Sequence, residues 1–238
     1  MRFAAVSEKG GRDKNEDAFN VIKRNGIYCF VLADGLGGHG SGEVASRIAV
    51  DTVLKCFAAQ TEISADMLYS YIEAAQNAIL EARNASPENA DMATTITVLI
   101  SDGEKAIWAH CGDSRIYRFR KHLIQEVTDD HSVAFVSFMA GEISYDEIRV
   151  SPDQNKLLRT LSDGNKFRPD ITGPVEVDKH TKFLLCSDGL WEYVHEDYME
   201  KTMKKSATPK KWLDKLIEER NSKAPYNSDN YSAIAVFV

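Results

Sequence analysis

Short apolar runs separated by turn residues characterise the beginning of the chain. Strands are expected at residues 3–6, 18–23 and 27–33. The dipeptide Asn25-Gly26 lies between the second and third runs, and it is the strongest signal for a two-residue hairpin in the sequence. The chain is therefore expected to begin with antiparallel strands.

Two helices are expected after these strands. From Glu43 to Phe57 the apolar positions recur at intervals of three and four residues, while charged residues four apart occupy the opposite face. Ser64 can cap a second helix, which has its own apolar stripe and ends before Pro87. Each helix has one face to bury, so both are expected to pack on the outside of a sheet.

Strands and helices follow in blocks along the rest of the chain. Further strands are expected at residues 94–100, 105–111, 114–120, 123–127, 171–177, 183–187 and 231–238. Helices are expected at residues 154–161, 196–204 and 209–220. Elements grouped in this way favour an α+β fold over alternating strand–helix–strand units. We expect one domain over residues 1–238, a central β-sandwich of two antiparallel sheets flanked by pairs of antiparallel helices in α-β-β-α layers.

Four short acidic blocks are spread over almost the whole chain. They are Asn15-Glu16-Asp17, Ala33-Asp34-Gly35, Ser187-Asp188-Gly189 and Ser228-Asp229-Asn230. Three of the blocks lie at the edge of an apolar run, where a carboxylate has no role in packing. Carboxylates that a fold gathers in one site repel one another and need a cation to remain charged. Ligands that are all oxygen atoms suit Mg²⁺ or Mn²⁺ better than Zn²⁺, so the blocks predict one site for hard divalent cations.

The composition limits the classes of function. The chain has 238 residues and a formal net charge of −7, from 29 basic and 36 acidic residues. Nucleic acid is not an expected partner, because phosphate backbones select clustered Lys and Arg. Membrane insertion and export are not expected either, since no apolar run reaches the ~18 residues of a spanning helix and no signal-peptide core is present. Four widely separated cysteines indicate free thiols in a reducing cytoplasm.

A glycine-rich segment after the third predicted strand offers an alternative interpretation. Residues 35–40, Gly-Leu-Gly-Gly-His-Gly, match the GxGxxG fingerprint of dinucleotide-binding folds and precede a predicted helix. That fingerprint also requires a second parallel strand that ends in an acidic residue about 20 residues on. Here a second helix follows, and Asp51 lies within the first one. We interpret the glycines as a turn without side chains, which lets the backbone approach a phosphate and its metal ions.

Six segments resemble, in order, the motifs of the metal-dependent protein phosphatases, the type 2C serine/threonine class. They are RDKNEDAF (residues 12–19), VLADGLGGHGSGEVAS (31–46), ATTITVLI (93–100), HCGDSRIY (110–117), FLLCSDGLWEYV (183–194) and SDNYSAIAV (228–236). The resemblance covers nearly the full chain, and the order and spacing of the six segments make it specific. The stretch from Asp130 to Leu161 also resembles the flap of bacterial members, which implies a flap at about residues 130–170 that shapes substrate access.

The resemblance implies a site for two Mn²⁺ or Mg²⁺ ions, with Asp34 as the bridge between them. The other ligands would be Glu16 and the Gly35 carbonyl on one ion, and Asp188 and Asp229 on the other. Asp17 would support these ligands from behind. Such a pair of ions lowers the pKa of a shared water, and the resulting hydroxide attacks phosphorus in line.

A third ion is also implied by the resemblance. Relatives hold it with the Asp of the GDSR motif, here Asp113, and with an Asp four residues after the one in SDG. Glu192 occupies that second position, where a longer carboxylate can still coordinate. Animal members place a His directly after the Asp-Gly pair as a proton donor, but this chain has Leu36, so the donor to the leaving group is unassigned. His39, three residues on, is interpreted as a residue of the helix start.

The resemblance also implies that Arg12 holds the substrate's phosphate oxygens, whose geometry a planar guanidinium matches better than a point charge does. The alternative is a surface ion pair of Arg12 with Asp13 or Glu16. Ser114 and Arg115 are expected to be structural rather than catalytic, and His110 is expected to be a packed residue of the sheet.

Together these features predict a cytoplasmic, monomeric enzyme of bacterial type that hydrolyses phosphoserine and phosphothreonine on proteins. It would reverse Ser/Thr kinase signalling, and its partners would be phosphorylated proteins and a cognate kinase system. Two alternatives remain: a pseudophosphatase that binds phosphoprotein without turnover, and a phosphatase for small phosphomonoesters. The enzyme is favoured because all the residues assigned to the ions and the phosphate are present, and a non-enzymatic relative would normally have lost one of them. These residues are Arg12, Glu16, Asp34, Gly35, Asp188 and Asp229.

Overall fold

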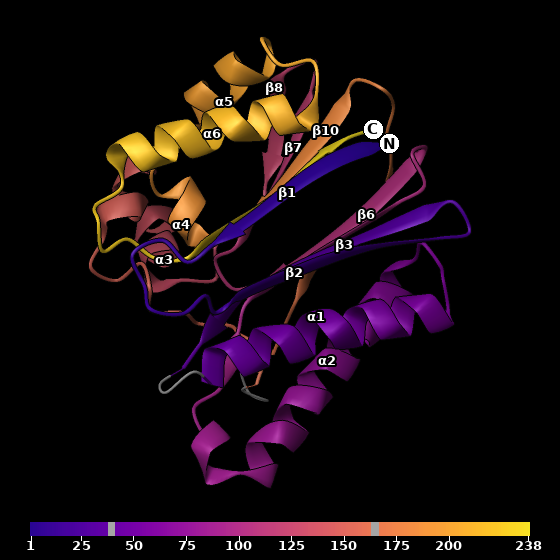
Figure 1. The fold of residues 1–238 in the computed structure, drawn as a ribbon, viewed down its shortest axis with the longest axis vertical. Coiled ribbons are helices and arrows are strands. Elements are labelled where there is room, and N and C mark those ends of the chain that lie inside the picture. Colours follow the sequence, from indigo (N-terminus) through magenta and orange to yellow (C-terminus); the bar gives the residue numbers. More distant parts are fainter. Residues whose placement is uncertain (38–40, 163–166) are drawn as a thin grey trace.

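Two antiparallel sheets lie face to face in the centre of the molecule, and helices cover their outer faces (Figure 1). The computed structural model describes residues 1–37, 41–162 and 167–238. His39 and part of the glycine-rich segment lie outside these ranges. The expected α-β-β-α layering is confirmed, and so is the rejection of a dinucleotide-binding fold, because all strand pairs in the described ranges are antiparallel.

The first sheet joins the two ends of the chain. Its strands, in spatial order, are β1 (Arg2–Glu8), β11 (Tyr231–Phe237), β10 (Thr181–Cys186), β7 (Arg115–Arg120) and β8 (Leu123–Val127). β1 pairs with β11 along its whole length, from Arg2 opposite Phe237 to Glu8 opposite Tyr231. The N- and C-termini therefore lie side by side (Figure 1).

The second sheet begins with the predicted hairpin. Its strands, in spatial order, are β2 (Asp17–Arg24), β3 (Ile27–Leu36), β5 (Ile96–Ser101), β6 (Lys105–Cys111) and β9 (Asp170–Glu176), with the short β4 (Ala93–Thr94) beside the end of β3. Asn25 and Gly26 connect β2 and β3 with φ angles of 51° and 84°. Positive φ at both positions is the signature of a type I′ turn, which explains why this dipeptide was a reliable signal.

Helices cover the outer face of each sheet. α1 (Ser41–Ala59) and α2 (Ala65–Ala85) pack on the second sheet, and Ser64 caps α2 as expected. α4 (Asp188–Trp191), α5 (Glu196–Met203) and α6 (Pro209–Lys223) pack on the first. α3 (Val133–Met139) and the short 3₁₀ helix η2 (Asp146–Val150) lie between β8 and β9, and a 3₁₀ turn η1 (Pro87–Asn89) follows α2. None of the helices in the described ranges is long and apolar enough to cross a membrane.

The central strands are apolar on both faces because both faces are covered. In β3, Val31 and Ala33 belong to the apolar core under α1 and α2, whereas Phe30 and Leu32 belong to the core between the two sheets. The same division holds in β10, where Phe183 faces the opposite sheet. A strand buried on both sides has a continuous apolar run instead of an alternating one. The run therefore ends abruptly where the strand reaches the edge of the sandwich, and the acidic residues begin there.

The prediction of a helix at residues 154–161 is wrong, because the structure has no helix there. The apolar residues that suggested it are used differently, because Leu157 forms an isolated bridge with Ser132 and Leu161 forms one with Thr94. An extended segment can reach two separate parts of the molecule in this way, whereas a helix could not. The four cysteines are free thiols, and Cys29, Cys111 and Cys186 are buried as their apolar surroundings predicted.

Candidate active site

A cleft of about 550 Å³ gathers residues from all four acidic blocks. Its walls include Arg12, Glu16, Asp34, Gly35, Asp113, Asp188 and Asp229. They come from the loop before β2, the end of β3, the loop between β6 and β7, the start of α4 and the loop before β11. Residues up to 217 positions apart in the sequence thus meet at one edge of the sandwich.

Glycines let these loops approach one another, backbone against backbone. A Cβ on Gly35 would lie 2.1 Å from the carbonyl oxygen of Gly42 and 2.6 Å from that of Glu16. A Cβ on Gly189 would lie 2.0 Å from the carbonyl oxygen of Asn230. Such distances are far below van der Waals contact, so no other residue fits at either position without displacing a neighbour. The glycine in each Asp-Gly pair therefore brings its block close to the next one.

The main chain of Asp34 is fixed by two threonines. The Asp34 N–H donates to Thr95 Oγ1 (3.0 Å), and its carbonyl accepts from the Thr95 N–H (2.8 Å) and from Thr94 Oγ1 (2.8 Å). Thr95 Oγ1 also shares a hydrogen bond of 2.8 Å with Ser114 Oγ, next to Asp113. With its backbone held from below, the Asp34 carboxylate is left to face the cleft.

Asp17 lies behind the cleft and does not line it. It pairs with Asp34 across β2 and β3, and its Oδ2 accepts a hydrogen bond of 2.8 Å from Ser187 Oγ. Its Oδ1 is buried and has no hydrogen-bond partner. Burial is the main cause that raises the pKa of Asp17 to about 6. Asp17 thus contacts Ser187, the residue before Asp188, from behind the cleft.

The clustered carboxylates raise one another's pKa values. For Asp34, burial raises the pKa well above its usual value, and the charges of Asp17 and Asp188 add to the effect. For Asp188, burial again comes first, followed by the charges of Asp113 and Glu192. The Asp188 Oδ1 atom is buried and has no hydrogen-bond partner. Divalent cations fit this site, because they would neutralise the charges and supply the missing partner with a ligand set of oxygen atoms alone.

Asp113 and Glu192, the pair expected to hold a third ion, interact electrostatically. Asp113 is 4% exposed, and burial, followed by the charge of Asp130, raises its pKa to about 7. Glu192 is not part of the cleft wall, but its charge raises the pKa values of both Asp113 and Asp188. The Glu192 N–H donates to the Asp188 carbonyl (3.0 Å) within the first turn of α4. Glu192 therefore lies one helical turn after Asp188.

Arg12 lies at the mouth of the cleft and forms an ion pair with Asp229. The distance from Arg12 Nη2 to Asp229 Oδ2 is 2.7 Å, and the Arg12 side chain is 57% exposed. The partner is thus neither Asp13 nor Glu16, the two alternatives in the sequence. A guanidinium that is mostly exposed at the mouth can reach both the carboxylates and an entering phosphate.

Asn230 organises the loop that carries Arg12, and the sequence analysis did not single it out. Its Nδ2 donates to the carbonyls of Lys9 (2.8 Å) and Lys14 (2.9 Å), and its Oδ1 accepts from the Glu16 N–H (2.8 Å). Asn230 is 6% exposed. Its position directly after Asp229 was visible in the sequence, but no pattern reveals contacts to a loop more than 200 residues away.

A second cluster of polar residues lies beside the cleft. His110, His131 and Asp170 are the one trio of His, Cys, Asp or Glu residues in the described ranges whose ligand atoms all lie within 4.8 Å of one another. The cleft carboxylates are spaced more widely than the atoms of this trio. Such a spacing suits two cations with shared ligands better than it suits a single cation.

The geometry of the trio does not suit a metal ion. The two imidazole rings are stacked, with centroids 4.5 Å apart and planes at 20°, so their in-plane lone pairs do not converge. The His131 Nδ1 atom accepts from the Gly112 N–H (3.1 Å), so its proton is on Nε2 and points to Asp170 Oδ2 (3.0 Å). His110 is buried in the sheet, as expected.

Comparisons with known proteins agree with this geometry. Residues 10–219 match the family model described as Protein phosphatase 2C. The serine/threonine phosphatase stp of Listeria monocytogenes is 31% identical over 232 residues, which cover 94% of this chain and 90% of that protein.

Solved structures share the fold. The crystal structure of the serine/threonine phosphatase PstP/Ppp of Mycobacterium tuberculosis has a TM-score of 0.86 and 28% identity, and the match covers 100% of this chain and 98% of that one. A structure of the PstP catalytic domain in complex with two manganese ions has a TM-score of 0.85 and 27% identity, over 98% of this chain and 96% of that one. The chain belongs to the protein phosphatase 2C family.

Proposed function

We propose that this protein hydrolyses phosphoserine and phosphothreonine on other proteins with the help of two Mn²⁺ or Mg²⁺ ions. The observation that carries the proposal is the meeting of the Arg12 guanidinium with carboxylates from all four acidic blocks and from Asp113 in a single cleft, which Asp13 and Lys14 also line. The residues that meet are Arg12, Glu16, Asp34, Asp113, Asp188 and Asp229. A phosphate group is an anion, so a cleft with this excess of carboxylates can accept it only when cations are also bound.

The cleft residues divide into ligands and substrate contacts. Asp34 would bridge the two ions, Glu16 and the Gly35 carbonyl would bind one of them, and Asp188 and Asp229 would bind the other. The chemistry that such ions supply is a lowered pKa of water, which makes water a nucleophile for phosphorus near neutral pH. Asp17 would hold its neighbours in place through Ser187, and Asp113 with Glu192 would hold a third ion.

Arg12 would bind two phosphate oxygens with its planar guanidinium and turn the phosphorus toward the ions. Leu36 also lines the cleft, so this position supplies no proton to the leaving serine or threonine oxygen. The flap at about residues 130–170 contributes Asn155 and Leu157 to the wall of the cleft. These two residues would contact the protein substrate around the phosphorylated residue.

The biological setting follows from the proposed chemistry. The substrates would be phosphorylated cytoplasmic proteins, and a cognate Ser/Thr kinase would provide them. We propose that the enzyme acts as a monomer, because the residues assigned to the ions and to the phosphate all come from one chain.

Hydrolysis assays test the proposal. The purified protein is given p-nitrophenyl phosphate and a phosphothreonine peptide with Mn²⁺, with Mg²⁺, or with EDTA. We expect turnover of both substrates that requires the metal and is lost in Asp188→Asn. The matched control is Asp178→Asn, which removes a carboxylate from the surface ion pair with Arg120 and should retain activity.

Three results would contradict the proposal. Hydrolysis that continues in EDTA would exclude a role for the ions. Binding of the phosphopeptide without any turnover would indicate a pseudophosphatase. Turnover of sugar phosphates at a much higher kcat/KM than the phosphopeptide would indicate a phosphatase for small phosphomonoesters.

A further inference from the structure

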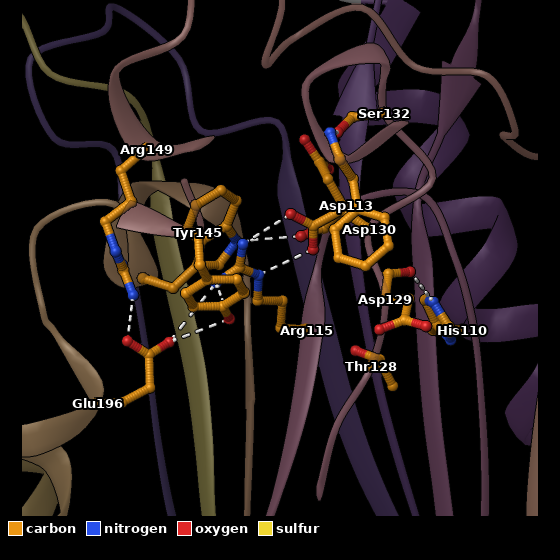
Figure 2. A network of polar contacts seen from close by, with 12 residues as sticks. His110, Asp113, Arg115, Thr128, Asp129, Asp130, Ser132, Tyr145, Arg149 and Glu196 are labelled. Carbon is orange, nitrogen blue, oxygen red and sulfur yellow. Dashed lines mark hydrogen bonds and ion pairs between the residues drawn. The ribbon is translucent and has the colours of Figure 1, made fainter. Parts of the chain in front are cut away.

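Four consecutive residues between β8 and α3 bind the segment that carries Asp113. Thr128, Asp129, Asp130 and His131, which we call the clamp segment, each hydrogen-bond with a residue between His110 and Ile116. Figure 2 shows the contacts of Asp129 with His110 and of Asp130 with Arg115. At one end, Thr128 exchanges two hydrogen bonds with Ile116, of 3.0 and 3.1 Å. The Asp129 carbonyl accepts from His110 Nε2 (2.8 Å). The loop between β6 and β7 is therefore held along its whole length.

Asp130 binds Arg115 through a buried, two-pronged ion pair. Arg115 Nε donates to Asp130 Oδ1 (2.8 Å) and Nη2 donates to Oδ2 (2.7 Å), and both side chains are almost fully buried. Paired hydrogen bonds between a guanidinium and a carboxylate fix orientation as well as distance. Arg115 lies two residues after Asp113, so the pair fixes the loop on that side.

His131 fixes the loop on the other side of Asp113. Its N–H donates to the Gly112 carbonyl (3.0 Å), and its Nδ1 accepts from the Gly112 N–H (3.1 Å). Both main-chain polar groups of Gly112, the residue before Asp113, are thus bound by His131. His131 is 6% exposed, so water does not compete strongly for these bonds.

Trp191 completes the support from a third direction. Its indole Nε1–H donates to the Asp113 carbonyl (3.0 Å), and the Arg115 guanidinium lies 3.5 Å from the centre of its ring. Trp191 directly precedes Glu192, the other residue assigned to the third ion. Arg115 therefore packs against the residue before Glu192, and it lies two residues after Asp113.

The same cluster also attaches the flap. Tyr145 donates to Glu196 and accepts from Arg115 Nη1 (3.2 Å), while Arg149 forms an ion pair with Glu196 (Figure 2). Tyr117 also donates to Glu196 (3.1 Å). The clamp segment is thus anchored in the core of the molecule, and the loop that it holds does not depend on exposed contacts.

We infer that Asp130 and His131 are positioning residues, which hold Asp113 where it can share a divalent cation with Glu192. The inference rests on the proposed function, and it adds two residues that touch neither substrate nor ion. Residues that orient metal ligands typically change metal affinity or activity by about 10- to 100-fold when they are replaced. The clamp segment is expected to act on the third ion, while the two central ions have ligands on other loops.

Direct binding of Mn²⁺ tests the inference, with the free ion measured by electron paramagnetic resonance. In the wild type we expect a weak class of sites in addition to the two tighter ones, and Asp113→Ala should remove it. His131→Leu should weaken that class by about 10- to 100-fold and leave the tighter ones unchanged. His131→Asn keeps an acceptor for the Gly112 N–H, so its affinity should stay near that of the wild type.

A test of the Arg115–Asp130 ion pair requires a variant that still folds. Asp130→Asn leaves the buried Arg115 with only its longer ion pair to Glu196 (3.7 Å), which is strongly destabilising. Replacing both Arg115 and Asp130 by apolar residues is often neutral. The double variant Arg115→Met with Asp130→Leu therefore removes the clamp contact and keeps the core filled. It should show the same loss of weak-site affinity, with a melting temperature near that of the wild type.

Double substitutions separate positioning from a general effect. Added to Asp113→Ala, His131→Leu should change neither Mn²⁺ binding nor the remaining turnover, because it acts through Asp113. A further loss in that background, or weak-site affinity in His131→Leu equal to that of the wild type, would overturn the inference. If these results occur while the wild type still needs Mn²⁺ for turnover, the proposed function stands and the positioning role alone is lost.

Discussion

Arg12 and Asp229 form a hydrogen-bonded ion pair of 2.7 Å between the first loop of the chain and the last. The two side chains are 57% and 37% exposed, so the pair is worth little in free energy. Asp229 is also assigned to an ion, and a cation bound there would compete with the guanidinium. Arg12 can therefore turn from carboxylate to phosphate at small cost when substrate and ions are present.

Arg12→Ala is expected to lower kcat/KM for a phosphothreonine peptide by about 10- to 100-fold. The physical reason is the loss of charge-assisted hydrogen bonds to phosphate, which are worth about 1.5–3 kcal/mol. Affinity for Mn²⁺ should not fall, because the substitution removes a positive charge that competes for Asp229. Steady-state kinetics and a Mn²⁺ titration check this, and an equal fall in Mn²⁺ affinity would assign Arg12 to the ion site instead.

Asp188→Asn is expected to stabilise the protein in EDTA while it abolishes metal-dependent activity. Burial raises the pKa of Asp188 well above its usual value, so the charged form destabilises the fold at pH 7.5 and the neutral amide relieves this cost. For a chain of this size about 1 kcal/mol corresponds to about 2–4 °C in melting temperature. Differential scanning calorimetry should show a rise in EDTA and a reduced response to Mn²⁺.

Asp178→Asn provides the contrast. Hydrogen bonds from His180 lower the pKa of Asp178, so there the charged form is favoured by the fold and its loss should lower the melting temperature. A rise in both variants would indicate a general effect of net charge rather than repulsion in the cleft.

Asn230→Ala is expected to loosen the loop that carries Arg12. The substitution removes three hydrogen bonds: Nδ2 donates to the carbonyls of Lys9 and Lys14, and Oδ1 accepts from the Glu16 N–H. At about 1 kcal/mol each, their loss should lower the free energy of unfolding by about 2–4 kcal/mol. Urea unfolding measures this loss. In a double-mutant cycle, Asn230→Ala should reduce kcat/KM less in an Arg12→Ala background than in the wild type. Equal reductions in both backgrounds would show that Asn230 does not act through Arg12.

The buried His131 is expected to make stability depend on pH. Burial is the main cause that lowers its pKa from 6.5 to about 4. As the pH falls from 6.5 to 4, the unfolded chain binds a proton that the folded chain does not, so the free energy of unfolding decreases with falling pH. The slope is at most about 1.4 kcal/mol per pH unit.

His131→Asn removes the titrating group and should make the free energy of unfolding depend less on pH between 4 and 6.5. The raised pKa values of Asp17 and Asp113 have the opposite effect, because their stabilising protonated forms are lost as the pH rises through about 6 and about 7. Asp17 and Asp113 are present in both the wild type and the variant. The difference in free energy of unfolding between the two proteins therefore reports the titration of His131. Urea unfolding in EDTA from pH 4 to 7 measures it, and a constant difference would contradict the assignment.

The layers of the fold could be predicted because they follow from burial alone. β6 and β8 begin and end at the expected residues, and β3, α1 and α6 differ from expectation by a few residues at their ends. The acidic blocks could be found because a carboxylate that interrupts the continuous apolar run of a strand such as β10 is conspicuous. These signals are local, since each depends on residues within about one element of the chain.

The remaining features depend on contacts between distant segments. Leu157 and Leu161 have helical spacing, yet they bridge to Ser132 and Thr94, and nothing near them in the sequence indicates those partners. Arg115 was expected to be structural, but its pairing with Asp130 across 15 residues has no periodic pattern. Polar residues that bind loops leave no signal in hydrophobicity, so the supports of the site became visible only in three dimensions.

The placement of β11 between β1 and β10 has a consequence for biosynthesis. β1 leaves the ribosome more than 200 residues before β11, its neighbour in the sheet, and Asp229 emerges just before β11. Such long-range pairing slows folding, because the chain must close a large loop before contacts compensate for it. A nascent or truncated polypeptide that lacks residues 229–237 therefore cannot complete the cleft, and phosphatase activity should begin only when synthesis has passed β11.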